Sequence, residues 1–145
     1  SLAFSGTAVS FPETLISSNP EYFYESCLLG WGSAKLNDFP IEHLMEYRKS
    51  WQDFETVRAM CDDYRAAIDI DFKLDEIDLE RSLDLPSLIL WGKDGAMDRS
   101  YNMSTVWKDW LPKLRSQAMP GGHFFPETSP KLTAEVLRTF LSANT

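Results

Sequence analysis

Residues 85–92 read LPSLILWG, a short apolar run that ends at a glycine. A continuous apolar run of this length is typical of a strand that is buried on both faces of a parallel sheet. Residues 114–119 provide one further candidate strand, and two strands are too few for a stable sheet. We therefore expect the chain either to be part of a larger sheet or to pair with a second copy.

Helical signals alternate with these two strands. A polar loop over 93–102 and a helix over 103–111 separate the strands, and a turn and a last helix that starts at Ser129-Pro130 follow the second one. The order of strand, helix, strand and helix is typical of an open α/β sheet.

Residues 1–84 contain several helix signals and no candidate strand. Asn19-Pro20, Pro40 and Asp53 can each begin a helix. The inward positions after Pro40 are expected to be Ile41, Leu44, Met45 and Tyr47. After Asp53, helical spacing predicts an inward stripe of Val57, Met60, Cys61, Tyr64 and Ile68. The chain therefore divides into a helical region, 1–84, and an α/β region, 85–145.

Charge and composition argue against several classes of protein. The net charge of −8 argues against nucleic-acid partners and against anionic membrane surfaces. No apolar run approaches the roughly 18 residues of a membrane helix. Cys27 and Cys61 form no CxxC motif, which favours reduced thiols and a cytoplasmic location. The acidic segment 69–80 lacks the spacing of a calcium loop, and we expect neither a metal nor a cofactor.

The chain has two histidines, His43 and His123. His43 lies within a predicted helix, and we expect a surface position for it. His123 follows two glycines directly after a candidate strand, and loops at the carboxyl ends of parallel strands are where α/β proteins place their sites. A histidine there can act as a general base or can be a structural residue.

Four motifs together carry a family resemblance. PSLILWG at 86–92 and GGHF at 121–124 resemble the C-terminal end of an α/β-hydrolase, and FYESCLLGWG at 23–32 and MCDDYRA at 60–66 resemble the cap of haloacetate dehalogenases. The resemblance implies the C-terminal part of an α/β-hydrolase, with a helical cap followed by the last two parallel strands and their helices. It also implies a small-molecule substrate, a halogenated carboxylic acid or ester.

The resemblance further implies roles for three residues. His123 corresponds to the general base, Tyr64 to a donor to the leaving halide, and Trp31 to a residue that lines the pocket. Phenol and indole groups are hydrogen-bond donors on apolar bodies, which suits them to a developing anion. Plain core packing is the alternative for both aromatic residues.

The nucleophile and the catalytic acid are less visible. The superfamily's nucleophile lies between two glycines four residues apart, and no two of the seven glycines here have that spacing. We therefore expect the nucleophile and the oxyanion loop upstream of Ser1, and we expect the chain alone to be inactive. Asp94 and Asp98 flank Gly95 as candidate acids, with turn residues or an acid upstream as the alternatives.

Three hypotheses about function remain open at this point. The chain can belong to a haloacetate dehalogenase-like hydrolase, to an ester or epoxide hydrolase of the same fold, or to a non-catalytic dimerising module. In each case an exposed strand edge invites pairing with another chain, so the sequence predicts a homodimer.

Overall fold

The computed structural model describes residues 11–30 and 34–144. The first part is helical and comprises α1 (Phe11–Ser18), α2 (Pro20–Gly30), a 3-10 helix (Leu36–Asp38), α3 (Ile41–Trp51), α4 (Phe54–Ala66), a π-helical stretch (Ala67–Asp71) and α5 (Phe72–Asp78). The second part comprises β1 (Ser87–Gly92), α6 (Ala96–Ser100), α7 (Met103–Val106), β2 (Leu114–Met119), α8 (Phe125–Thr128) and α9 (Pro130–Ser142). The predicted fold, helices followed by two parallel strands with their helices, is confirmed.

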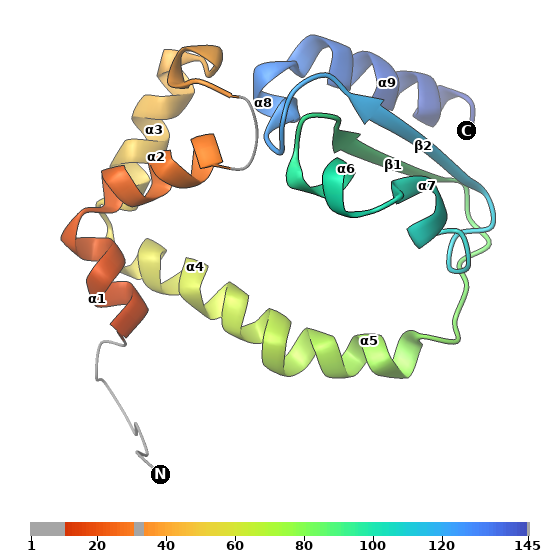
Figure 1. The fold of residues 1–145 in the computed structure, drawn as a ribbon, viewed down its shortest axis with the longest axis horizontal. Helices are drawn as coiled ribbons and strands as arrows, with labels where there is room; N and C mark the ends of the chain where they lie inside the picture. Colours follow the sequence, from red (N-terminus) through yellow and green to blue (C-terminus); the bar gives the residue numbers. More distant parts are fainter. Residues whose placement is uncertain (1–10, 31–33, 145) are drawn as a thin grey trace.

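The elements form two groups joined by a long arm (Figure 1). Helices α1, α2 and α3, here called the helical group, lie together on one side. Helices α4 and α5 form the arm, which runs from this group toward the two strands. Helix α9 lies on one side of the strands, and α6 and α7 lie on the other. In the described part of the chain, no helix is long and apolar enough to cross a membrane.

Local signals explain where the helices begin. The side chain of Asn19 accepts a hydrogen bond from the backbone N–H of Tyr22 at 3.3 Å, at the start of α2. The Asp53 carboxylate accepts from both the N–H and the hydroxyl of Thr56, at 2.9 and 2.7 Å, at the start of α4. These side chains satisfy amide groups that have no partner within the first turn of a helix. The predicted helix starts are therefore confirmed.

Strands β1 and β2 pair in parallel, from Ser87 beside Leu114 to Gly92 beside Met119. Residues 87–91 are half-buried, whereas the sequence predicted burial on both faces. The described residues contain no third strand beside these two. Met119 at the end of β2 is fully buried, so the carboxyl end of the sheet is its best-packed part.

The main apolar core lies within the helical group. Leu28, Phe39, Leu44 and Trp51 are buried together. Tyr24 stacks on Trp51 with 5.1 Å between the ring centroids. This core therefore holds α2 against α3, close to the point where the chain later returns from β2.

Two helix faces differ from the sequence prediction. Leu44 is buried, but Ile41 and Met45 are 56% and 62% exposed on α3. On α4, Val57 is buried, whereas Tyr64 is 73% exposed. Helical spacing predicts which residues share a face, but it does not predict how far along that face other elements pack.

The connection between the strands also differs from the prediction. The expected loop over 93–102 contains α6, and the expected helix over 103–111 is reduced to the single turn of α7. A helix of five residues is too short to show helical periodicity, which explains why α6 was missed, whereas over 103–111 the apolar spacing continues beyond the single turn that forms.

Candidate active site

The turn that carries His123 follows β2 and lies against the loop that follows β1. The backbone N–H of Asp94 donates to the carbonyl of Gly121 at 3.0 Å. A Cβ atom on Gly92 would lie 1.9 Å from the carbonyl oxygen of Gly122, so a side chain at position 92 would force the two loops apart. Gly121 has a φ of +97°, which side chains other than glycine rarely adopt. The glycines that the sequence singled out therefore bring the two loops into contact.

The His123 ring is linked to the core of the helical group by ring contacts through Phe124. It contacts Phe124 edge to face, with centroids 4.9 Å apart. Phe124 in turn contacts Phe39 of the buried core, with centroids 6.3 Å apart. His123 itself is exposed, so its imidazole can reach a bound molecule.

A cavity of about 760 Å³ lies between the helices and this turn. Small-molecule sites in proteins commonly have volumes of about 300–1,000 Å³. The lining is mainly apolar and aromatic, with a few polar side chains: Phe23, Tyr24, Cys27, Leu28, Tyr47, Trp51, Met60, Asp63, Tyr64, His123, Phe124, Pro126 and Glu127. We call it the main cavity. It brings together two residues that the sequence singled out, His123 and Tyr64.

Tyr64 reaches the main cavity from the far half of α4. The expectation that it faces inward in a buried stripe is wrong, because the described residues leave it 73% exposed, and Ile68 one turn later is 75% exposed. Its hydroxyl consequently does not require a protein partner, since solvent can supply one. Its role as a donor to a leaving group stays a prediction.

Three other predicted site residues lie elsewhere or are not described. Trp31 lies outside the described residues. Asp98 accepts a hydrogen bond from the indole N–H of Trp91 at 2.5 Å, and the backbone carbonyl of Asp94 accepts from Arg99 at 2.9 Å. Neither aspartate lines the main cavity. Both contacts lie within the end of β1 and the segment that follows it, and a catalytic role for either aspartate stays a prediction.

A polar link between α3 and α8 was not predicted. His43 Nδ1 donates to the Glu127 carboxylate at 2.9 Å, and Glu127 lines the main cavity. Burial and a hydrogen bond with Glu127 raise the pKa of Tyr47 on the same helix. His43 is exposed, as expected, but no local pattern reveals a partner 84 residues away.

Tyr24 is a second residue that sequence reasoning missed. Its hydroxyl is buried and has no hydrogen-bond partner within the described ranges. Burial raises the pKa of this phenol to about 12, so it stays protonated at neutral pH. The apolar spacing of α2 did not mark Tyr24 as a site residue. What distinguishes Tyr24 is a buried hydroxyl without a hydrogen-bond partner among the described residues, and spacing along the sequence cannot reveal that.

The remaining polar groups offer little reactive chemistry. Cys27 and Cys61 are free thiols, and burial raises the pKa of both. A raised pKa keeps a thiol protonated and unreactive. Residues 11–30 and 34–144 contain no group of three or more His, Cys, Asp or Glu side chains that could hold a metal ion. The arrangement offers one histidine base and phenolic donors around an apolar cavity.

Comparisons with known proteins give a consistent assignment. No family model matches the chain. The chain is 44% identical over 132 residues to a fluoroacetate dehalogenase of Burkholderia sp, and the match covers 91% of this chain and 43% of that protein.

Solved structures share the fold. A structure described as an α/β hydrolase of Nostoc sp PCC 7120 superposes with a TM-score of 0.86 at 36% identity, covering 92% of this chain and 46% of that one. A structure described as an epoxide hydrolase of Pseudomonas aeruginosa gives 0.81 at 29% identity, covering 94% and 46%.

The chain thus spans less than half the length of each of these relatives. The resemblance inferred from GGHF and MCDDYRA is confirmed by the sequence match, and the helical and parallel-strand architecture is confirmed by the structural matches. On these grounds the chain resembles the haloacetate dehalogenase-like α/β-hydrolases, with a match over 91% of this chain and 43% of the fluoroacetate dehalogenase.

Proposed function

We propose that the chain provides the helical cap, 1–84, and the general-base region, 85–145, of a hydrolytic dehalogenase. The main cavity carries this proposal, because it is lined by both His123 and Tyr64. The 44% identity to a fluoroacetate dehalogenase supports a halogenated carboxylic acid as the substrate class. In this proposal the nucleophile, an aspartate, comes from outside these 145 residues.

The proposed reaction has two steps. The aspartate carboxylate attacks the carbon that bears the halogen, an ester bond forms, and the halide leaves with the bonding electron pair. His123 then takes a proton from a water molecule, and the resulting hydroxide attacks the ester carbonyl. The ester C–O bond breaks, and the alkoxide oxygen of the hydroxy acid takes the proton of the new carboxyl group. The hydroxy acid leaves, the carboxylate is regenerated, and His123 releases the proton from water to solvent. Tyr64 donates its O–H to the departing halide, where negative charge develops.

A chimera tests the proposal. This chain is joined to the part of the Burkholderia fluoroacetate dehalogenase that lies outside the matched region, and halide release is measured after a melt shows that the chimera is folded. We expect turnover of a haloacetate. His123→Ala should lower turnover by about 10²–10⁴-fold, the usual contribution of a general base. Because the first step needs no base, one halide per chain should still be released and mass spectrometry should find a trapped ester.

The outcomes separate the alternatives. Full turnover in His123→Ala would show that His123 is not the general base. His43→Ala is the control and should remain active, because His43 does not line the main cavity. The 145-residue chain alone should release no halide. The match to a structure described as an epoxide hydrolase favours a second candidate, so an epoxide and a simple ester are assayed alongside the haloacetate. Turnover of either, without halide release, would favour that candidate.

A further inference from the structure

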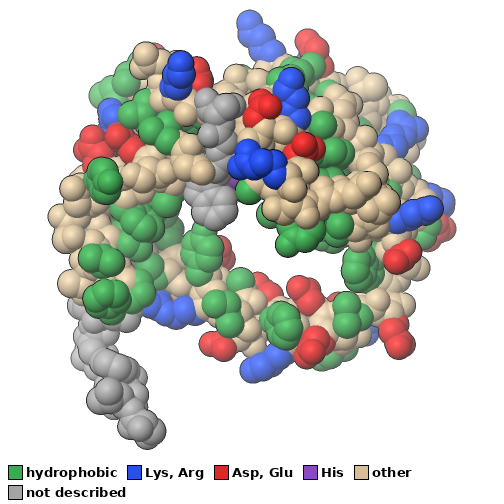
Figure 2. All heavy atoms as spheres, in the orientation of Figure 1, with side chains coloured by type: hydrophobic (Ala, Val, Ile, Leu, Met, Phe, Trp, Pro, Cys, Tyr) green, Lys and Arg blue, Asp and Glu red, His purple; other side chains and the backbone are tan. Residues whose placement is uncertain are grey.

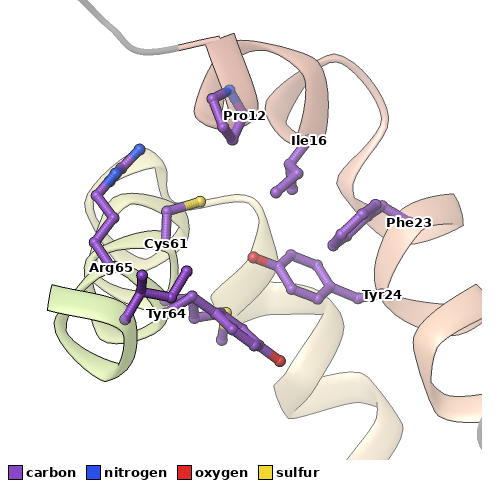
Figure 3. A pocket seen from close by; sticks show the side chains of 9 residues that line it. Pro12, Ile16, Phe23, Tyr24, Cys61, Tyr64 and Arg65 are labelled. Atoms are coloured by element: carbon purple, nitrogen blue, oxygen red, sulfur yellow. The ribbon is translucent and has the colours of Figure 1, made fainter. Parts of the chain in front are cut away.

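A second cavity, of about 290 Å³, lies beside the main cavity (Figure 3). It is lined by residues of α1, α2, α4 and the start of the π-helical stretch, and it is open to solvent on the side of Tyr64 and Ile68. Its lining comprises Pro12, Ile16, Phe23, Tyr24, Met60, Cys61, Tyr64, Arg65 and Ile68. Four of these residues also line the main cavity: Phe23, Tyr24, Met60 and Tyr64. The two cavities therefore share a wall, and a molecule in one can extend toward the other past four side chains.

The second cavity is apolar. Ile16 and Phe23 reach from α1 and α2 toward Cys61 on α4, and their side chains face one another across the hollow (Figure 3). Tyr64 directs its hydroxyl away from the hollow. The surface that lines the hollow is thus almost entirely apolar.

The cationic group at the rim is already paired. Arg65 lies 2.6 Å from Glu13 and 2.7 Å from Asp62, and its guanidinium points away from the hollow (Figure 3). The Tyr24 phenol and the Cys61 thiol are neutral at pH 7, because burial raises the pKa of both. A charged occupant would lose its hydration without gaining a partner, which is unfavourable. An uncharged apolar occupant fits this lining.

We propose that the second cavity is the subsite for an apolar side chain of the substrate. The substrate class would then be a 2-halocarboxylic acid with an alkyl or aryl substituent, and not a haloacetate alone. This inference rests on the proposed function, since the carboxylate and the halogen would lie in the main cavity. At roughly 30 Å³ for a water-sized group, a volume of about 290 Å³ corresponds to about nine or ten such groups, so a substituent of about four to six carbons fits with space to spare.

Binding of unreactive acids to the folded chimera tests the subsite, because the described residues that line the main cavity include the acids Asp63 and Glu127 and no Lys or Arg that could hold the carboxylate. The probes are acetate, butyrate, hexanoate and 4-phenylbutyrate, and the readout is the NMR shift of the Met60 methyl group in the shared wall. We expect each added methylene to tighten binding about threefold to fourfold until the cavity is full, which follows from burial of apolar surface.

Two variants separate the subsite from non-specific binding. Ile68→Trp fills the second cavity from an exposed position, so it leaves the core unchanged. It should leave acetate binding as it is and abolish the gain with chain length. Ile70→Trp is the matched control, because Ile70 is similarly exposed and lines neither cavity; the gain should persist in this variant.

Flat affinity across the series, or the same gain in Ile68→Trp as in the unmodified chimera, would overturn the subsite. Failure of the proposed function is a different result. In that case the chimera releases no halide from any acid, while the dependence of binding on chain length is unchanged.

Discussion

At the scale of single residues, the buried carboxylate of Glu13 stands out because nothing in its local sequence marks it. Glu13 is only 2% exposed in the first turn of α1, and Arg65 of α4 lies 2.6 Å from it. The hydrogen bond from Arg65 lowers the pKa of Glu13, although burial alone would raise it. This pair ties α1 to α4 at the edge of the second cavity.

Glu13→Gln tests the contribution of this pair. The variant keeps the shape and removes the charge, so we expect the free energy of unfolding at pH 7 to fall by about 2 kcal/mol, the scale of a hydrogen bond to a charged group. Glu55→Gln is the control, because Glu55 pairs with Arg58 on the surface and should change stability by less than about 0.5 kcal/mol.

The pH dependence of Glu13→Gln has a definite sign. Because the pKa of Glu13 is lower in the folded state, its stabilisation is present above the unfolded pKa and is lost as the pH falls through the folded pKa. Urea melts between pH 7 and pH 3 should therefore show the two proteins converging toward acid. A difference that stays constant down to pH 3 would contradict this explanation.

Tyr64 shows what single residues reveal from sequence and what they do not. MCDDYRA marked it as a site residue, and the structure places it on the wall of the main cavity. Its burial was predicted wrongly, because spacing cannot reveal that no described element covers the face of α4 that carries Tyr64, although α1 packs near Arg65. Glu127 and Tyr24 line the same cavity, yet their roles depend on contacts between distant segments.

At the scale of elements, the contact between the loops after β1 and β2 sets the position of the His123 turn. Gly92→Ala should push Gly122 away, since the new Cβ would lie 1.9 Å from its carbonyl oxygen. We expect a loss of about 1–3 kcal/mol in the free energy of unfolding, as for other overpacked positions. The NMR resonances of the His123 imidazole should shift with it.

Gly30→Ala is the matched control for this substitution. Gly30 ends α2, and a Cβ there would meet nothing within 4 Å. Stability should be unchanged or slightly higher, because alanine favours helix more than glycine does. Equal losses of unfolding free energy in Gly92→Ala and Gly30→Ala would contradict the prediction that the contact between the two loops positions the His123 turn. Unchanged His123 resonances in Gly92→Ala would also contradict it.

Most element boundaries could be predicted from sequence, because they depend on local chemistry. Asn19-Pro20, Asp53 and Ser129-Pro130 mark helix starts through capping and fixed dihedral angles, and LILWG marks a strand through its continuous apolar character. The short helix α6 and the exposed face of α3 could not be predicted in this way. Helix α6 is too short to show a helical period, and the exposure of α3 depends on which elements pack against it.

At the scale of the whole molecule, many apolar side chains remain in water. Figure 2 shows apolar side chains gathered along the arm, around an opening between the arm and the strands. Those on the π-helical stretch and α5 are more than half exposed: Ile68, Ile70, Phe72, Leu74 and Ile77. Patches of this kind on soluble proteins usually mark an interaction surface.

We expect the 145-residue chain to form a dimer or a larger assembly. Burial of these side chains and pairing at the edge of β1 both favour association. Sedimentation velocity measures the oligomeric state at protein concentrations from about 1 to about 50 μM. Exposed apolar surface drives association at concentrations of this order. Replacing Phe72 and Ile77 with lysine should shift the population toward monomer, and a compact monomer of the unmodified chain throughout this range would contradict the prediction.

The separation of the two groups of elements has a consequence for folding kinetics. Contacts within the helical group, such as α1 with α2 and α2 with α3, join neighbours in sequence, and local contacts of this kind form quickly, whereas the parallel pairing of β1 with β2 joins segments farther apart. The links from Phe39 to Phe124 and from His43 to Glu127 must instead close a loop of about 84 residues. Contacts that form after the rate-limiting step affect the unfolding rate rather than the folding rate. Because the links beside His123 close so long a loop, we expect them to form late and to set how long the two groups stay joined, while the local pairs set how fast the helical group forms.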